Sequence, residues 1–217
     1  LIYTFMKHLK MFEDFTIDGF DMEYFKQLSS FRKRIDYCGK YLKRLSSGSS
    51  RIVYIVDEQK VLKIAKNSKG LEQNRAEGDY FIQKKYIDIV TEMYDKDEQN
   101  DTWILCERAR KLTPNKFTEM VGIPLSKLDF YLNLKYAQDK NAKVDKKAFS
   151  TFLTNDEITK IENSSFCQEI LSMMYEVNLL PGDLGRLSSY GIVKRKDKEV
   201  VVLLDYGVSE HYDIHYK

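Results

Sequence analysis

The sequence has few prolines and cysteines, and it lacks both a strong net charge and a long apolar run. Its three cysteines (Cys38, Cys106 and Cys167) are far apart and odd in number. They fit neither a disulfide framework nor the short spacing of a zinc site, and they favour a reducing compartment such as the cytoplasm. With 35 basic and 33 acidic residues, the formal net charge is +2. This balance gives no indication of nucleic-acid binding or of attachment to an anionic membrane.

Signals for membranes and export are also missing. No apolar run reaches the ~18 residues that a transmembrane helix needs. The first residues have neither a basic start nor a small-residue cleavage site, so they do not resemble a signal peptide. The 3 prolines, against 15 tyrosines and 12 phenylalanines, favour long helices with aromatic packing. We expect one large domain or two small lobes with a proper core.

The stretch Val200–Gly207 joins an apolar run to an acid. Five apolar residues are followed by Asp205, Tyr206 and Gly207. The run predicts a buried strand, and an acid at its end can emerge from the core into a cleft. A carboxylate fixed there suits a divalent cation bound to phosphates. The alternative is an ordinary strand closed by an Asp-containing turn, and this stretch alone does not decide between them.

Apolar periodicity predicts helices first, then strands, then helices, and finally a hairpin. Aromatic residues at helical spacing in residues 1–40 are typical of a core-facing helix pair, with a docking surface as the alternative. Residues 111–180 have helical periodicity, with a helix start at Asn155 and a helix end near Asn178. The segments between them predict strands at 41–45, 52–56 and 61–65, a helix at 70–86, and a hairpin from 87–94 and 102–106. This order predicts an α+β fold with a sheet lobe and a helical lobe.

The connection between the first two strands, residues 46–51, is rich in small residues. A backbone of this kind can approach a ligand closely, and its N–H groups and hydroxyls can face phosphate oxygens. In the third strand, Lys63 interrupts an apolar run. Lys63 is either an edge residue whose amine snorkels to water or a cation that faces a ligand. Glu77 is the acid best placed to reach it, with Glu72 as the rival. Two further acids, Asp183 and Asp205, fall at the same end of the C-terminal hairpin and could serve a cation and a nucleophile.

Taken in order, these parts resemble the protein-kinase-like superfamily over about residues 41–210. Six features carry the resemblance. Four are short motifs: Ser46–Val53 is similar to the glycine-rich loop G-x-G-x-x-G-x-V, Val61–Lys63 to V-A-I-K, Gly182–Leu184 to H-R-D or H-G-D, and Asp205–Gly207 to D-F-G. The other two are Glu77, in the place of the helix acid that pairs with the lysine, and Cys106–Ala109, in the place of the adenine-binding hinge. The short catalytic region looks more like small-molecule and atypical kinases than protein kinases, and it is similar to kinase-like proteins of large bacteriophages.

The resemblance implies a two-lobed kinase-like fold in three parts. Residues 1–40 would be an N-terminal helical extension, residues 41–110 an N-lobe with a five-stranded antiparallel sheet, and residues 111–217 a truncated helical C-lobe. Two loop glycines are replaced, by Ser46 and Arg51. Only ten residues follow Gly207, which leaves no room for an activation segment. We therefore expect either a minimal kinase fold or a piece of a longer chain.

The resemblance also implies a site for ATP and Mg²⁺. The nucleotide would contact three groups: the phosphate-covering Ser47, Gly48 and Ser49; the phosphate-binding Lys63 with its partner Glu77; and the adenine-binding backbone of Glu107 and Ala109. Asp205 would hold Mg²⁺, with Ser188 (or Ser189, if the loop has an extra residue) in place of the family's asparagine. Asp183 would orient or deprotonate the acceptor hydroxyl.

Two functions follow from this resemblance. The first is an ATP- and Mg²⁺-dependent phosphotransferase acting on an unknown acceptor hydroxyl. The second is a pseudokinase or structural module with a protein partner, in the host cytoplasm or a virion if the chain is phage-encoded.

Overall fold

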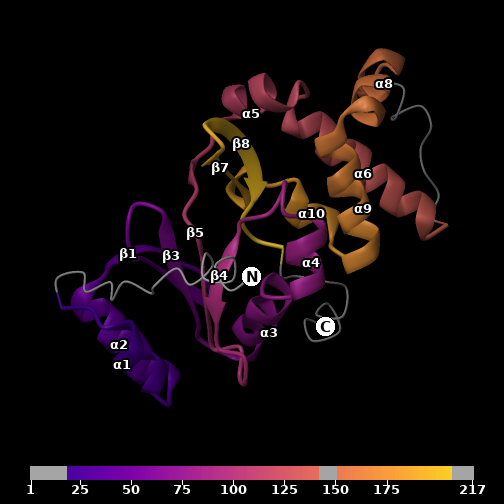
Figure 1. Cartoon of the computed structure of the whole chain (residues 1–217). Coiled ribbons are helices and arrows are strands. Elements are labelled where there is room, and N and C mark those ends of the chain that lie inside the picture. Colours follow the sequence, from indigo (N-terminus) through magenta and orange to yellow (C-terminus); the bar gives the residue numbers. More distant parts are fainter. Residues whose placement is uncertain (1–18, 142–150, 207–217) are drawn as a thin grey trace, which may run out of the picture.

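The computed structural model describes residues 19–141 and 151–206, which form two antiparallel sheets and a group of helices (Figure 1). The larger sheet has the order β1-β2-β3-β5-β4, with β1 at Lys43–Ser47, β2 at Arg51–Ile55, β3 at Lys60–Ala65, β4 at Met93–Lys96 and β5 at Trp103–Glu107. The smaller sheet has the order β6-β7-β8, with β6 at Arg110–Lys111, β7 at Tyr190–Arg195 and β8 at Lys198–Leu203. The predicted α+β class and five-stranded antiparallel sheet are confirmed.

The helices precede, interrupt and follow the larger sheet. They are α1 (Met22–Gln27), α2 (Phe31–Tyr41), α3 (Ser68–Glu77), α4 (Tyr80–Lys85), α5 (Pro114–Val121), α6 (Leu125–Asp139), α8 (Asn155–Asn163), α9 (Ser165–Val177) and α10 (Pro181–Leu184). Among the described residues, none of these helices is long and apolar enough to cross a membrane.

The ends of α8 and α9 lie where the sequence predicts them. Thr154 and Glu157 form a capping box that starts α8 at Asn155. Asn178 ends α9 in the left-handed conformation with φ 55°, and its amide donates to the Met174 carbonyl oxygen. Each end satisfies backbone groups that a helix terminus would otherwise leave unpaired.

The helix predicted over residues 70–86 is wrong as one element, because the chain breaks after Glu77. Gly78 caps α3, and the Asp79 carboxylate then accepts from the Ile82 amide at 3.0 Å and starts α4. A side chain at position 78 would meet the Asn74 carbonyl oxygen at 2.9 Å, so glycine fits this tight break. The following strand also starts late: β4 begins at Met93, and the residues before it run alongside the end of β8 instead.

The two faces of the larger sheet differ in chemistry. One face packs against α1 and α2 in an apolar cluster that includes Phe20, Phe25, Cys38, Ile52, Tyr54, Leu62, Ile64 and Trp103. Figure 1 shows α1 and α2 on one side of the strands and α3 on the other. Because side chains alternate along a strand, Arg51 and Lys63 point to the face that α3 covers. The helices that precede the sheet thus close one face and leave the other for the charged residues.

A second apolar cluster lies in the helical half of the chain. It joins α5, α6, α8 and α9 to β7 and β8 through fully buried residues such as Phe117, Leu128, Leu132, Ile161, Ile170 and Leu203. This cluster includes Leu184 and Leu203, so it supports α10, which contains Asp183, and the end of β8, just before Asp205. Gly207, predicted as the last residue of the motif, lies outside the described residues.

Candidate functional site

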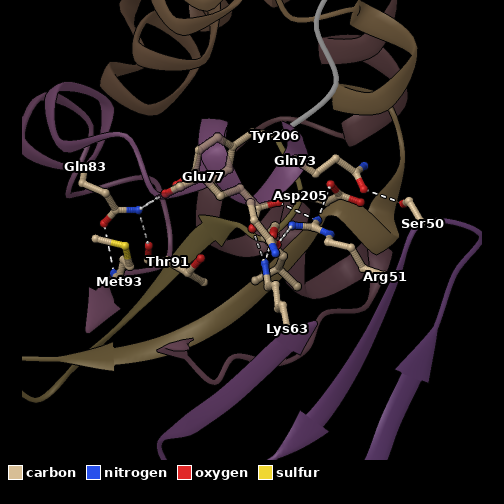
Figure 2. A network of polar contacts seen from close by, with 12 residues as sticks. Ser50, Arg51, Lys63, Gln73, Glu77, Gln83, Thr91, Met93, Asp205 and Tyr206 are labelled. Atoms are coloured by element: carbon tan, nitrogen blue, oxygen red, sulfur yellow. Dashed lines mark hydrogen bonds and ion pairs between the residues drawn. The ribbon is translucent and has the colours of Figure 1, made fainter. Parts of the chain in front are cut away.

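Four charged side chains meet between the larger sheet, α3 and the end of β8 (Figure 2). Lys63 Nζ lies 2.6 Å from Glu77 Oε2, which confirms the pairing predicted from the sequence. Arg51 Nη2 lies 2.6 Å from Glu77 Oε1 and 2.9 Å from Asp205 Oδ1. Glu77 therefore gives one oxygen to each cation, and Arg51 bridges the two carboxylates.

Strand register brings the two cations together. Val53 pairs with Lys63 and Arg51 pairs with Ala65 across β2 and β3, so Arg51 and Lys63 are diagonal neighbours on one face. The Lys63 ammonium also donates to the carbonyl oxygen of Leu204 at 2.6 Å. This bond joins the sheet to the residue immediately before Asp205.

Burial and charge decide the protonation of this cluster. Glu77 is 2% exposed, and Lys63 and Arg51 are each 7% exposed. Burial works to raise the pKa of Glu77, but the charges of Arg51 and Lys63 outweigh it and hold that pKa below its usual value. Burial works to lower the pKa of Arg51, yet Glu77 and Asp205 raise it above its usual value. Both partners of the buried Arg51–Glu77 ion pair thus remain charged.

Asp205 lies at the open end of the cluster. Its side chain is 51% exposed. Partial burial raises the pKa of Asp205, and repulsion by Glu77 and Asp183 adds to it, against the attraction of Arg51 and Lys63. The site therefore presents a reachable carboxylate beside two buried cations.

Asp183 lies close enough to Asp205 for the two carboxylates to repel each other, as their place on the hairpin predicts. Asp183 Oδ1 is 3.0 Å from Arg186 Nη1. The buried Ser189 hydroxyl donates to the Asp183 carbonyl oxygen at 2.7 Å, and the Ser189 carbonyl oxygen accepts from the Leu204 amide at 2.7 Å. Ser189 thus connects α10, which contains Asp183, to the residue before Asp205, whereas Ser188 is exposed and no described contact joins it to either aspartate.

The serine-rich loop is held by the start of α3. Lys66 Nζ donates to the Gly48 carbonyl oxygen at 2.6 Å and lies 3.4 Å from Ser47 Oγ, while Asn67 Nδ2 donates to the Ser49 carbonyl oxygen at 3.2 Å. A side chain at Gly70 would meet the Ser50 carbonyl oxygen at 2.3 Å, so the loop and the helix approach closely. The predicted phosphate-covering residues are therefore fixed beside an exposed lysine that the sequence argument did not single out.

The segment predicted to bind adenine connects the two sheets. The Glu107 amide donates to the Glu92 carbonyl oxygen at 2.8 Å, and its carboxylate bonds to Arg195. Arg195 also donates to the Val90 carbonyl oxygen at 2.7 Å. Ala109 packs against the backbone of Gly191, where an added side chain would lie 2.6 Å from the Ala109 Cβ. These contacts fix the connection, and its role in binding adenine stays a prediction.

A buried polar network holds Tyr206 and Glu77 from behind the charged cluster. The Tyr206 hydroxyl donates to the Glu77 carbonyl oxygen at 3.1 Å, and Gln83 Nε2 donates to the Tyr206 oxygen at 2.7 Å. Gln83 also donates to the Thr91 carbonyl oxygen and accepts from the Met93 amide, at 3.1 and 3.0 Å. The sequence analysis did not single out Gln83. Its amide side chain next to the apolar Ile82, in a segment predicted to be helical, was the signal that could have indicated a buried polar contact.

The residues present do not fit the predicted magnesium site. Across residues 19–141 and 151–206, no three His, Cys, Asp or Glu side chains are grouped so that they could hold a metal ion. One oxygen of Asp205 already bonds to Arg51, and Ser188 is exposed without a described contact to the aspartates. Asp183 likewise has one oxygen 3.0 Å from Arg186 Nη1. Each of the one or two carboxylates that usually hold Mg²⁺ beside substrate phosphates is therefore already paired with an arginine of the chain.

No family model matches the chain, and no curated protein matches it in sequence. Solved structures do match. SAICAR-synthase from Saccharomyces cerevisiae is 9% identical, with a TM-score of 0.36 over 76% of this chain and 73% of that one. The streptomycin–ATP–APH(2")-IIa ternary complex is 12% identical, with a TM-score of 0.34 over 83% and 71%. The GDP complex of aminoglycoside 2'-phosphotransferase-IIIa is 13% identical, with a TM-score of 0.37 over 81% and 70%.

All three TM-scores lie below 0.4 and all three identities at or below 13%. The chemistry of the site therefore rests on contacts within the chain itself. Those contacts are the buried Lys63–Glu77 pair, its bridge through Arg51 to Asp205, and the nearby Asp183.

Proposed function

We propose that this chain is a kinase-like protein that binds ATP and transfers a phosphoryl group to an acceptor hydroxyl. The observation that carries the proposal is the buried Lys63–Glu77 pair, placed beside the reachable Asp205. A buried ion pair is a costly arrangement and by itself a weak source of stability. The pair lies beside a second cation, Arg51, and next to the partly exposed Asp205, and this position supports a role in binding a phosphate-bearing ligand.

Lys63 is prepared for a phosphate group. An ammonium has three donors, and Lys63 uses one for Glu77 and one for the Leu204 carbonyl oxygen. The third donor is available for a phosphate oxygen. Because Glu77 and Leu204 already fix the ammonium, little side-chain freedom would be lost when the nucleotide binds. Adenine would then lie against the segment that contains Glu107 and Ala109, below the loop of Ser47, Gly48 and Ser49.

Asp183 is the residue proposed to act on the acceptor. A carboxylate beside the phosphate site can orient the attacking hydroxyl and accept its proton. Asp183 is partly exposed and lies at the end of the helical half, where an acceptor can approach from solvent. Phosphoryl transfer depends mainly on positioning and charge stabilisation, which Lys63, Arg51 and Asp183 would supply together.

The test measures ATP affinity by calorimetry and ATP turnover, with and without Mg²⁺, for the wild type and three variants. Lys63→Ala is expected to weaken ATP binding tenfold or more, whereas Lys43→Ala, an exposed lysine on the same sheet, should leave it unchanged. Asp183→Asn should keep ATP affinity and lower turnover by about 10²–10⁴-fold. If Lys63→Ala bound and turned over ATP like the wild type, the assignment of the site would be wrong.

A second candidate is a nucleotide-binding scaffold without phosphoryl transfer. Two ion pairs favour it: Arg186 holds one oxygen of Asp183, and Arg51 holds one oxygen of Asp205. Both acids are thus engaged by cations of the chain itself. ATP binding that depends on Lys63, with no turnover for any acceptor hydroxyl tried, would favour this candidate.

A further inference from the structure

Arg51 occupies an unexpected place in the proposed nucleotide site. It stands where the resemblance expects the last glycine of the loop, yet its guanidinium lies in the buried cluster and not over the loop. One nitrogen, Nη2, bonds to both Glu77 Oε1 and Asp205 Oδ1, while Nη1 lies 3.4 Å from Asn74 Oδ1. Figure 2 shows this guanidinium between the two carboxylates.

The position of Arg51 bears directly on metal binding. A cation that took Asp205 Oδ1 would displace the arginine from one of its two carboxylate partners, and both Arg51 and Lys63 would then repel it. Arg51 would keep only Glu77, which it already shares with Lys63. The carboxylate groups around Arg51 and Lys63 are Glu77, Asp205 and, further out, Asp183. A positive charge is therefore already present where a divalent cation would otherwise neutralise Asp205.

We propose that Arg51 takes the place of a divalent cation at Asp205, so that the chain binds nucleoside polyphosphates without a metal ion. The proposal rests on the proposed nucleotide site and specifies how that site is charged. Arginine suits this role because its planar fork can hold carboxylates and phosphate oxygens at the same time, and it stays protonated. Lys63 and Arg51 would face the polyphosphate together, with Glu77 fixing both.

The first experiment needs only the wild-type chain. ATP affinity is measured by calorimetry in excess EDTA and again in excess Mg²⁺. Metal-free ATP carries more negative charge than its magnesium complex, so affinity in EDTA is expected to equal or exceed that in Mg²⁺. A fall of tenfold or more in EDTA would overturn the role of Arg51 and leave the nucleotide site standing. Absence of binding in both conditions would overturn the nucleotide site itself, and this proposal with it.

The second experiment changes the arginine. Arg51→Gln should weaken the binding of metal-free ATP about tenfold or more, because a charge-assisted contact is lost. It should also make affinity increase with Mg²⁺, because Asp205 is then free. Arg51→Lys should keep part of the metal-free affinity, and Arg44→Gln, an exposed arginine on β1, should behave like the wild type.

Circular dichroism shows whether each variant is folded. If Arg51→Gln does not fold, the proposal is still tested by the wild-type affinities in EDTA and in Mg²⁺ and by Arg51→Lys. A folded Arg51→Gln that binds metal-free ATP as tightly as the wild type would contradict the proposal.

Discussion

The same two strands, β2 and β3, present an apolar face and a charged face. Ile52, Leu62 and Ile64 point into the cluster under α1 and α2, and alternate positions carry Arg51 and Lys63. The apolar face gains stability from the area it removes from water, which requires no particular geometry. The charged face depends on short contacts to Glu77, and a buried ion pair adds little to stability. We infer that the first face maintains the fold and the second is kept for binding.

Among the substitutions that test the two faces, removal of the Glu77 carboxylate should cause the largest loss in the free energy of unfolding. Glu77→Ala leaves Lys63 and Arg51 buried without their shared carboxylate, so we expect a loss of about 3–5 kcal/mol in the free energy of unfolding. Urea denaturation measures this loss. Glu72→Ala, on the same helix and without a described ion pair, is the matched control and should change stability little. A loss no larger than that of the control would mean that the charged face does not need its acid.

Truncating a side chain on the apolar face should lower the free energy of unfolding and leave ATP affinity unchanged. Leu62 is fully buried, so Leu62→Ala is expected to cost about 3 kcal/mol through lost burial and the cavity left behind. Because its side chain points away from Lys63, ATP affinity of the folded variant should remain within about twofold of the wild type, a change of ~0.4 kcal/mol.

Urea denaturation and calorimetry below the unfolding transition check both expectations. Leu45→Ala, whose side chain is half-exposed on β1, should change neither quantity. A large loss of ATP affinity in Leu62→Ala would show that the two faces are not independent.

The pairing of Lys63 with Glu77 could be predicted because local patterns carry it. Alternation along β3 places the lysine on one face, and the helix that follows brings an acid back to that face within a short stretch of chain. The start of α8 and the end of α9 were likewise predictable from their capping residues. The break at Gly78 had a signal too, since glycine followed by aspartate is typical of one helix ending and another beginning.

The role of Arg51 could not be predicted in the same way. Its partner Asp205 lies 154 positions away, and no local pattern contains both residues. In the sequence, Arg51 ends the serine-rich connection and stands at the position of a replaced loop glycine. The fold instead places it at the first position of β2, on the buried face. The short strand β6 was missed for a similar reason, because its two residues become a strand only by pairing with β7.

The smallest expected loss of stability comes from removing a tyrosine hydroxyl, and each face offers one to compare. The Tyr206 hydroxyl lies in the buried network with Glu77 and Gln83, whereas the Tyr54 hydroxyl makes a single bond, to the carbonyl oxygen of the half-buried Ile35, at 3.2 Å. Tyr206→Phe should cost about 1–2 kcal/mol, because two buried bonds of the hydroxyl are lost, to the Glu77 carbonyl oxygen and to Gln83 Nε2, and Tyr54→Phe, which loses one, about 0.5–1 kcal/mol. Only Tyr206→Phe should also weaken ATP binding, since its hydroxyl holds the backbone of the residue that fixes Lys63 and Arg51. Urea denaturation and calorimetry of both variants measure the difference, and equal effects on affinity would mean that the network behind the charged face does not position it.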